Sequence, residues 1–578
     1  MNASFPALSR RRFVQGLGAS GALALAGGWP QGALAQAVAP SPRQLSGNRF
    51  ELEIAEQAVN YTGRAALATT VNGSLPAPTL RWRQGEEVSL RVTNRLAVPS
   101  SIHWHGILLP ADMDGVPGIS FAGIAPGETF TYRFRVLQAG TYWYHGHSGF
   151  QEQTGLYGAL LVEPEHGEPL AVERDYTLML SDWTDEDPMR IFGRLKADSE
   201  YFARAKPSVA QFARDVENLG LAAAWDRRAM WNRMRMSPTD LQDVSGATYT
   251  YLVNGATPAA NWTAIAEPGE RVRLRFINAG TSTYFDVRIP GLPLTVVASD
   301  GQAVAEVTVD EFRIAPGETY DVLVRMPDAQ AYSIFCQSMD RSGYARATLA
   351  PVAGMQAAVP SLDPPVWLDM RDMGHGEGTM AGMEHMAMAG MDHGSMAGMD
   401  HAAMPAMPAS APLPTSAQVD MRVANPSDAL DDPGPRLRGN GRRVLTYADL
   451  SSLGGGLDPR PPTRDLVLRL TGNMQRFVWG FDGLKYNEAE PIPLRYGERL
   501  RLRLINDTMM NHPIHLHGMF FEVENEASGV LLRKHTVNVQ PGKQVALLVS
   551  ADAPGEWAFH CHLLYHMEAG MFRKVVVA

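Results

Sequence analysis

Three copies of one short sequence pattern recur along the chain, and they constrain its fold more than any other feature. The copies are GEEVSLRVTN (Gly85–Asn94), GERVRLRFIN (Gly269–Asn278) and GERLRLRLIN (Gly497–Asn506). Each alternates apolar and polar residues, as a half-buried strand does, because side chains two positions apart point to the same face. Each is followed by a Pro-Gly turn and a further strand pattern. Three equivalent β-units predict three β-sandwich domains.

The length and composition agree with this fold class. A chain of 578 residues with 45% hydrophobic and 19% charged residues is long enough for several domains and has an ordinary globular composition. These values exclude a fibre, a disordered chain and a bundle of membrane helices. Of the two cysteines, Cys336 lies in an apolar alternating run and is predicted to be a buried strand residue, so no disulfide framework is expected.

The N-terminus has the pattern of a cleaved export signal. Three consecutive arginines at positions 10–12 precede a weakly apolar stretch and an A-x-A site that ends at Ala35 or Ala37. This order predicts a twin-arginine signal peptide over residues 1–37 and a periplasmic protein without a membrane anchor; a basic arm on a cytosolic protein is the alternative. Loss of residues 1–35 removes three arginines and no acid, so the net charge falls from −10 to −13. Such an acidic chain argues against nucleic acid or an anionic membrane as a partner.

Two segments depart from the β pattern. Residues of about 190–240 place helix formers at helical spacing and are predicted to form a helical insertion. Residues 361–418 are rich in Met, His, Gly, Ala and Pro with few large aliphatic residues, which is the composition of a linker. The predicted domains are therefore residues 46–165, residues 166–360 with the insertion, and residues 419–578.

Ten of the sixteen histidines fall in four short clusters. The clusters contain His103 and His105; His145 and His147; His512, His515 and His517; and His560, His562 and His566. In a strand, each H-x-H pair can present two imidazoles on one face, so four pairs offer eight imidazoles. Cys561 lies between His560 and His562 and must point to the other face. His512, an odd three positions before His515, is expected to share the face of Cys561, so two separate metal centres are predicted.

The chemistry of these donors indicates copper. His512, Cys561, His566 and, five residues further, Met571 form a His₂Cys set with a weak thioether, which is the ligand signature of a blue-copper electron-transfer site. Zinc is the main competitor, but structural zinc prefers short Cys-x₂₋₄-Cys spacings that this chain lacks. The eight imidazoles suit a cluster of copper ions, since neutral imidazole binds copper well and no carboxylates lie within the motifs.

These motifs, in this order, resemble the four copper motifs of the multicopper oxidases, and the repeat is similar to the three cupredoxin domains of that family. The arginine leader, the MRMSPTD segment (Met234–Asp240) and the Met/His linker resemble the periplasmic copper-resistance oxidases in particular. The resemblance implies an all-β fold of three cupredoxin-like Greek-key β-sandwich domains. It also implies four coppers per chain, namely one type 1, one type 2 and two type 3.

The resemblance further implies a role for each ligand. The type 1 copper would be held by His512, Cys561, His566 and Met571, and the type 2 copper by His103 and His515. One type 3 copper would be held by His105, His145 and His562, and the other by His147, His517 and His560. Family members couple the one-electron oxidation of a reductant to the four-electron reduction of dioxygen to water. The backbone from Cys561 to its two neighbouring histidines would connect the centres, and the second domain would act as a spacer.

Dioxygen reduction also needs protons. Asp114 in MDGVPG matches an acidic residue near the cluster in the family, although Asp114-Gly115 can also be interpreted as a simple turn. Bacterial relatives often have an acid directly after the second type 1 histidine. This chain has Met567 there, followed by Glu568. Asp114 and Glu568 are therefore the candidate proton donors.

Three functions are compatible with the sequence. The first is an oxidase that converts Cu(I) to the less membrane-permeant Cu(II) in copper resistance. The second is a laccase-like oxidase of phenols, and the third is a non-catalytic copper-binding or storage protein. The complete ligand set argues against storage, since binding alone needs no cysteine joined to a cluster. The expected partners are dioxygen, Cu(I) or phenolic reductants, and other periplasmic copper-handling proteins.

Residues 381–404 consist of three consecutive eight-residue units, AGMEHMAM, AGMDHGSM and AGMDHAAM. Thioethers favour Cu(I) over Cu(II) and zinc. We therefore expect capture of Cu(I) by Met383, His385, Met391, His393, Met399 and His401. The alternative is a flexible linker, although flexible linkers are usually rich in Gly and Ser.

Overall fold

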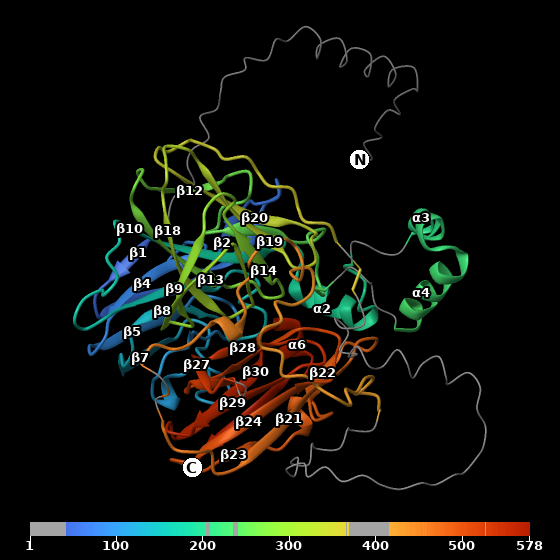
Figure 1. Ribbon diagram of the computed structural model, residues 1–578. Coiled ribbons are helices and arrows are strands. Elements are labelled where there is room, and N and C mark those ends of the chain that lie inside the picture. Colours follow the sequence, from blue (N-terminus) through green and yellow to red (C-terminus); the bar gives the residue numbers. More distant parts are fainter. Residues whose placement is uncertain are drawn as a thin grey trace, which may run out of the picture. The chain divides into compact units, whose positions relative to one another are not determined.

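Three β-sandwiches, each built from two sheets, make up the described part of the chain (Figure 1). The computed structural model describes residues 42–203, 208–234, 241–365, 367–368, 415–454, 456, 458–525 and 528–578, which belong to one compact unit, Val38–Ala578. The predicted signal peptide and the Met/His repeats lie outside the described residues. The predicted all-β fold class is confirmed.

The first sandwich contains a five-stranded and a four-stranded sheet. The first sheet has the order β1 (Gln44–Ser46), β4 (Ala77–Arg83), β9 (Tyr157–Glu163), β8 (Gly140–His145) and β6 (His103–His105). The second has the order β3 (Ala66–Val71), β2 (Arg49–Val59), β5 (Glu87–Asn94) and β7 (Thr129–Arg135). A short 3₁₀ turn, η1 (Ala111–Met113), follows β6.

The second sandwich contains no strand with a clustered histidine. Its six-stranded sheet has the order β11 (Thr250–Val253), β10 (Arg174–Trp183), β13 (Arg271–Asn278), β18 (Thr319–Arg325), β15 (Leu294–Ser299) and β16 (Gln302–Val309). Its five-stranded sheet has the order β12 (Trp262–Ile265), β20 (Tyr344–Ala350), β19 (Tyr332–Ser338), β14 (Phe285–Arg288) and β17 (Glu311–Ile314). Cys336 lies in β19 without exposed surface, as predicted.

The third sandwich repeats this plan. One sheet has the order β22 (Val478–Phe481), β21 (Asp465–Asn473), β24 (Arg499–Asn506), β29 (Gln544–Ser550), β26 (Phe521–Asn525) and β27 (Val530–Lys534). The other has the order β23 (Ile492–Leu494), β31 (Phe572–Val577), β30 (Gly555–Cys561), β25 (His512–Leu516) and β28 (Thr536–Val539). The turns η2 (Tyr447–Asp449) and η3 (Tyr486–Glu488) and the short helix α6 (Leu564–Glu568) complete it.

The three sequence repeats are strands β5, β13 and β24, which occupy the same place in each sandwich. Each pairs in parallel with one neighbour and antiparallel with the other. The asparagine at the end of each repeat is fully buried. The amide of Asn94 donates to the carbonyls of Val98 and Ile124, both at 2.8 Å, and Asn278 and Asn506 each donate to two equivalent carbonyls. The repeated asparagine therefore satisfies one backbone carbonyl just after the strand and one on a segment 30 to 36 residues further along the chain, which is a structural reason for the repeat.

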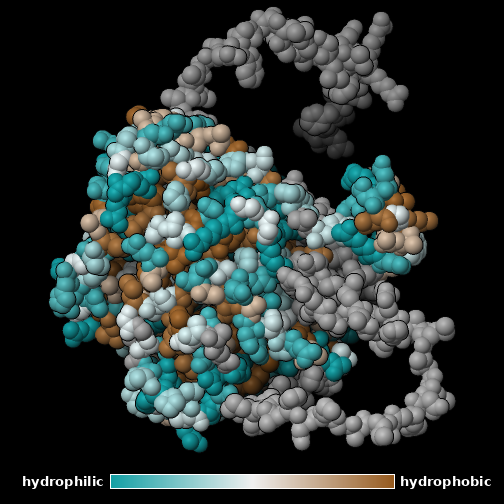
Figure 2. Space-filling model, viewed as in Figure 1, coloured by the Kyte–Doolittle hydropathy of each residue, from teal (hydrophilic) through white to brown (hydrophobic). Residues whose placement is uncertain are grey.

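Helices lie where the sequence predicts an insertion. They are α2 (Pro188–Ala197), α3 (Val209–Leu219) and α4 (Leu221–Met234). The Asp187 side chain accepts a hydrogen bond from the N–H of Met189, and Pro188 occupies the first helical turn, which is a common helix start. α3 and α4 expose apolar side chains such as Val209 and Trp225, next to polar ones (Figure 2). Among the described residues, no helix is long and apolar enough to cross a bilayer.

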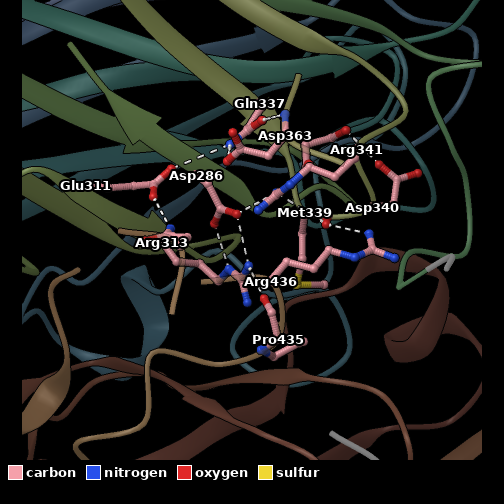
Figure 3. Close-up of polar contacts among 12 residues, drawn as sticks. Asp286, Glu311, Arg313, Gln337, Met339, Asp340, Arg341, Asp363, Pro435 and Arg436 are labelled. Carbon is pink, nitrogen blue, oxygen red and sulfur yellow. Dashed lines mark hydrogen bonds and ion pairs between the residues drawn. The ribbon is translucent and has the colours of Figure 1, made fainter. Parts of the chain in front are cut away.

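A buried charge network joins the second sandwich to the chain that enters the third (Figure 3). Asp286 of β14 has no exposed surface and accepts hydrogen bonds from Arg313, at 2.7 and 2.9 Å, and from Arg341, at 2.6 Å. Arg313 also donates to the carbonyl of Pro435 at 3.0 Å. Because a buried carboxylate is tolerated only when it is paired, this network fixes the path of the connection.

Candidate metal centres

Two strand pairs carry the histidine clusters. β6 pairs antiparallel with β8 so that His103 lies opposite His145, and β25 pairs antiparallel with β30 so that His515 lies opposite His560. The remaining members of the H-x-H pairs are His105 at the end of β6, and His147, His517 and His562 just beyond their strands. Two neighbouring strands in each of two sheets, which belong to different sandwiches, thus carry all four pairs.

Eight imidazoles converge in three groups, two of which share His105. Within each group, one nitrogen of every ring lies within 4.8 Å of the others. The groups are His103, His105 and His515; His105, His145 and His562; and His147, His517 and His560. All eight rings are buried except that of His147, which is partly exposed. The first and third sandwiches each contribute four rings.

The unpartnered nitrogens of these rings fit metal ligation. Atoms without a hydrogen-bond partner are Nε2 of His103, His145, His147 and His515, Nδ1 of His105, and both nitrogens of His562. A buried unsatisfied polar atom ordinarily costs about 1–3 kcal/mol, so a cluster of them needs a ligand to explain it. Burial is the main cause that lowers the pKa of His560 to about 4, and burial together with neighbouring imidazoles lowers the pKa of His105 and His515 well below the usual value. These three rings are therefore neutral at pH 7, which is the form that binds copper.

Asp114 links histidines of the two sandwiches. It is 1% exposed, and its carboxylate oxygens lie 3.3 Å from Nδ1 of His103 and 2.9 Å from Nδ1 of His517. Its carbonyl also lies 2.9 Å from Nδ1 of His103. Gly115 has φ +84°, and a Cβ there would lie 1.9 Å from the carbonyl oxygen of Ile102. Asp114-Gly115 is thus a turn that also orients two rings, leaving Nε2 of each directed at the centre.

Sequence reasoning missed three residues that orient rings of the cluster. Glu152 lies 2.7 Å from Nδ1 of His145, and burial raises the pKa of its carboxyl group well above the usual value. The carbonyl of His535 and the hydroxyl of Thr536 lie 2.7 and 3.2 Å from Nδ1 of His515. Glu152 lies five residues after His147, and His535 is an isolated histidine in the sequence KHT. Neither position belongs to a periodic pattern that indicates a partner of a metal ligand.

A second donor group lies on the opposite face of β30. The Cys561 sulfur is 3.6 Å from Nδ1 of His512 and 3.9 Å from Nδ1 of His566, and the two nitrogens are 3.2 Å apart. Met571 is fully buried; its N–H donates to the carbonyl of His566 at 3.0 Å, and its carbonyl accepts from the N–H of Cys561 at 3.1 Å. Burial raises the pKa of the Cys561 thiol, so a cation is needed to hold it as a thiolate. The trigonal spacing of two nitrogens and one sulfur fits a blue-copper site.

The outer side of this second group is covered. The ring of Trp479 stacks on His566 at 4.0 Å, and Phe477 meets it edge-on at 5.8 Å. Nε2 of His566 lies 2.9 Å from a carboxylate oxygen of Asp243, and Nε2 of His512 lies 2.7 Å from the Thr508 hydroxyl. Asp243 comes from the chain just before β11, so the second sandwich contributes to this centre without giving a histidine. The second sandwich therefore does more than the spacer role predicted from the sequence.

Glu568 is not among the grouped donors. It is exposed at the end of α6 and lines a cleft of about 520 Å³ together with His147, Lys196 and Lys485. The cleft reaches His147, the one cluster ring that is partly exposed. The predicted Cu(I)-capture residues of the Met/His tract lie outside the described part of the chain.

Comparison with known proteins agrees with this geometry. The multicopper oxidase family is matched over residues 53–167, 219–355 and 459–578. The structure is similar to that of Fet3p, described as a multicopper oxidase that functions in iron import, with a TM-score of 0.63 and 18% identity over 92% of this chain and 90% of that one.

Two relatives match almost the entire chain. Copper resistance protein A of Escherichia coli is 53% identical over 98% of this chain and 99% of its own length. A copper resistance protein A homolog of Pseudomonas syringae pv. tomato is 54% identical over the same shares. The chain thus has two sets of donors that fit copper, three β-sandwiches and relatives that match almost its entire length. It belongs to the multicopper oxidases, which are copper-dependent oxidoreductases, and within them to the copper resistance protein A type.

Proposed function

We propose that the protein oxidises Cu(I) to Cu(II) in the periplasm, reduces dioxygen to water, and thereby serves copper resistance. The names of the two full-length relatives support the biological role. The arginine pattern at positions 10–12 supports export by the twin-arginine route. Dioxygen and a one-electron reductant are the substrates that the family implies, and periplasmic copper-handling proteins are the proposed partners.

The ligand roles follow the donor groups. His512, Cys561, His566 and Met571 are proposed to hold the type 1 copper, and His103 and His515 the type 2 copper. His105, His145 and His562 are proposed for one type 3 copper, and His147, His517 and His560 for the other. Three of the observed groups support these sets, including the one that contains the cysteine. When bound, copper supplies the redox chemistry, taking up single electrons and delivering four to dioxygen.

The protein contributes the connection, the protons and the control of access. Cys561 is covalently continuous with His560 and His562, so β30 gives a bonded route between the two centres. The Asp114 carboxylate lies 2.9 Å from Nδ1 of His517 and is the proposed proton donor at the cluster. Glu568, on the cleft that reaches His147, is the proposed donor at the solvent side, in the absence of an acid at Met567.

The observation that favours Cu(I) over phenols is the covered type 1 site. His512, Cys561, His566 and Met571 have no exposed surface, so the ring of a phenol substrate cannot contact His566 directly. The group that lies against Nε2 of His566 is instead a carboxylate, Asp243, at 2.9 Å. A carboxylate attracts a cation such as Cu(I), and at this distance from the His566 ring it would hold that cation next to a type 1 ligand.

We expect Asp243→Ala to separate the two substrates. Dioxygen uptake with Cu(I) should fall about tenfold or more, because the carboxylate that attracts the cation to the type 1 ligand is lost. Uptake with a phenol should change less. The measurement is oxygen-electrode uptake by copper-loaded protein with chelator-buffered Cu(I) or with a methoxyphenol. Asp226→Ala on the exposed face of α4 is the matched control. Faster turnover of the phenol than of Cu(I) by the unaltered protein would favour the laccase-like alternative instead.

The described residues that follow the Met/His tract are anchored near the type 1 site. The N–H of Asp420 donates to the carbonyl of Gly472 at 3.0 Å, and its carboxylate accepts from the N–H of Met474 at 2.8 Å. Met474 begins the turn that ends at Phe477, whose ring lies 5.8 Å from that of His566. This anchoring supports the proposal that Met383, His385, Met391, His393, Met399 and His401 capture Cu(I) for the type 1 site.

Deletion of residues 381–404 should then leave the absorption spectrum and phenol oxidation nearly unchanged. Cu(I) oxidation should fall, most clearly when a competing chelator keeps free Cu(I) scarce, because soft thioethers capture Cu(I) in competition with the chelator. A deletion variant refilled with a Gly/Ser segment of equal length controls for chain length. Equal Cu(I) kinetics for the intact and refilled proteins under limitation would mean that the tract is a linker.

A further inference from the structure

A carboxylate of the second sandwich lies against the segment that holds two cluster imidazoles. Asp300 follows β15 and has no exposed surface. One of its oxygens accepts hydrogen bonds from the N–H groups of His535, at 3.2 Å, and Thr536, at 3.1 Å. The other accepts from the N–H of Thr319 at 3.1 Å. Asp300 therefore ties the beginning of β28, in the third sandwich, to the second sandwich.

The segment that Asp300 holds contacts the rings directly. The carbonyl of His535 lies 2.7 Å from Nδ1 of His515, and the Thr536 hydroxyl lies 3.2 Å from the same nitrogen. The same hydroxyl lies 3.2 Å from Nε2 of His105. Each ring thus has one nitrogen held by this segment, while Nε2 of His515 and Nδ1 of His105 have no partner and face the other donors. The position of His535–Thr536 consequently sets which nitrogen of His515 and of His105 is available to a metal.

The Asp300 carboxylate is itself held by a buried ammonium group. Nζ of Lys534, which has no exposed surface, lies 3.2 Å from Asp300, 3.1 Å from Glu318 and 2.9 Å from the Ser299 hydroxyl. Burial opposes both charges, but the pair overcomes it: the pKa of Lys534 is raised by Asp300 and Glu318, and the pKa of Asp300 is lowered by Lys534. A buried pair with these extra hydrogen bonds is rigid, since breaking either partner leaves an unpaired charge.

The His535 ring leaves the segment little freedom to move. It meets the rings of His105 and His515 edge-on at 4.8 and 5.4 Å. On another side it packs against Gly106, where a Cβ would lie 2.4 Å from its Nε2. Close packing on these sides means that a change at Asp300 cannot be absorbed without moving the rings that His535 touches.

We propose that Asp300 is a positioning residue for the type 2 centre. It acts through the backbone of His535–Thr536 to fix His515 and, with it, His105. The second sandwich, which supplies no histidine, thereby controls how tightly the cluster holds copper. The inference rests on the proposed assignment of His515 as a type 2 ligand.

The test is Asp300→Asn. Asp300 has φ +48°, a conformation that asparagine tolerates, but asparagine has only one acceptor oxygen for the two sets of N–H groups. We expect the type 2 electron paramagnetic resonance signal to need about tenfold more free copper for half-occupancy than in the unaltered protein. The blue absorption of the type 1 site, which shows that the variant is folded, should be unchanged. Copper titration in a metal buffer measures both.

Asp321→Asn is the matched control. Asp321 lies in the same sandwich, is equally buried and is paired with Arg273 at 2.5 Å, but it contacts the first sandwich through Thr141 instead of His535–Thr536. An unchanged type 2 titration in Asp300→Asn, or an equal loss in Asp321→Asn, would overturn the proposal. His515→Ala separates the two levels of inference. If it keeps the type 2 signal, the ligand assignment fails; if it loses the signal and Asp300→Asn does not, only the positioning role fails.

Discussion

Cys561→Ser is expected to abolish the intense blue absorption and nearly all turnover while the cluster histidines still bind copper. The blue band arises from the thiolate–copper bond, and serine keeps the size of the side chain but offers a harder, poorly donating oxygen. Cys561 is the sulfur donor beside His512 and His566, at 3.6 and 3.9 Å, so no other residue there can replace it. Turnover should fall well over a hundredfold, since even outer partners of a metal ligand contribute 10–100-fold.

Absorption spectroscopy and copper analysis of the purified variant measure the outcome. Copper content should decrease by one per chain at most, because the opposite face of β30 carries the cluster. The matched control is Cys336→Ser, which alters the only other cysteine of the chain, buried in β19 of the second sandwich. It should keep the blue colour and the activity. An intense blue band that survives in Cys561→Ser would refute the type 1 assignment.

His103→Ala is expected to remove the type 2 copper and leave the blue band nearly intact. His103 and His515 are proposed as the only protein ligands of that ion, so the loss of one ring leaves too few donors. Dioxygen reduction should fall at least about a hundredfold, more than the loss of an outer partner would cause. The blue site should survive because its donors lie on the other face of β30, and no described donor group contains both His103 and Cys561.

Paramagnetic resonance, which separates the type 1 and type 2 signals, and copper analysis test this expectation. His166→Ala, at an exposed histidine outside the clusters, serves as the control and should retain four coppers. Bleaching of the blue band in His103→Ala would contradict the separation of the two centres. His515→Ala should behave like His103→Ala, and this result also supports the interpretation of Asp300→Asn.

Much of the site could be predicted because strand periodicity is local. A period of two places alternate side chains on one face, so His560 and His562 must separate from Cys561 wherever β30 lies. The register of β25 against β30, with Ile514 opposite Cys561 and His515 opposite His560, agrees with that parity. The repeated strands likewise follow from a local pattern, including the asparagine that closes each of them.

The residues that orient the rings could not be predicted in this way. Asp114 and His517 are 403 positions apart, and His105 and Thr536 are 431 apart, yet each pair lies within hydrogen-bond distance. No spacing in the sequence encodes such a contact. Asp114 was identified only through a family resemblance. Asp243 and Asp300 lie in a sandwich without clustered histidines, and no sequence pattern marks either of them as a neighbour of a copper site.

The sequence by itself therefore determined three β-sandwiches, two faces of metal donors and the choice of copper, because strand alternation and donor chemistry act within a few residues. Only the tertiary structure decided which ring nitrogen faces each centre, that Asp243 covers His566, and that Asp300 holds the segment beside His515. The physical reason is that these contacts arise where separate sandwiches pack together. Burial there demands a partner for every charge and hydrogen-bonding group, and that partner is set by the packing of distant segments.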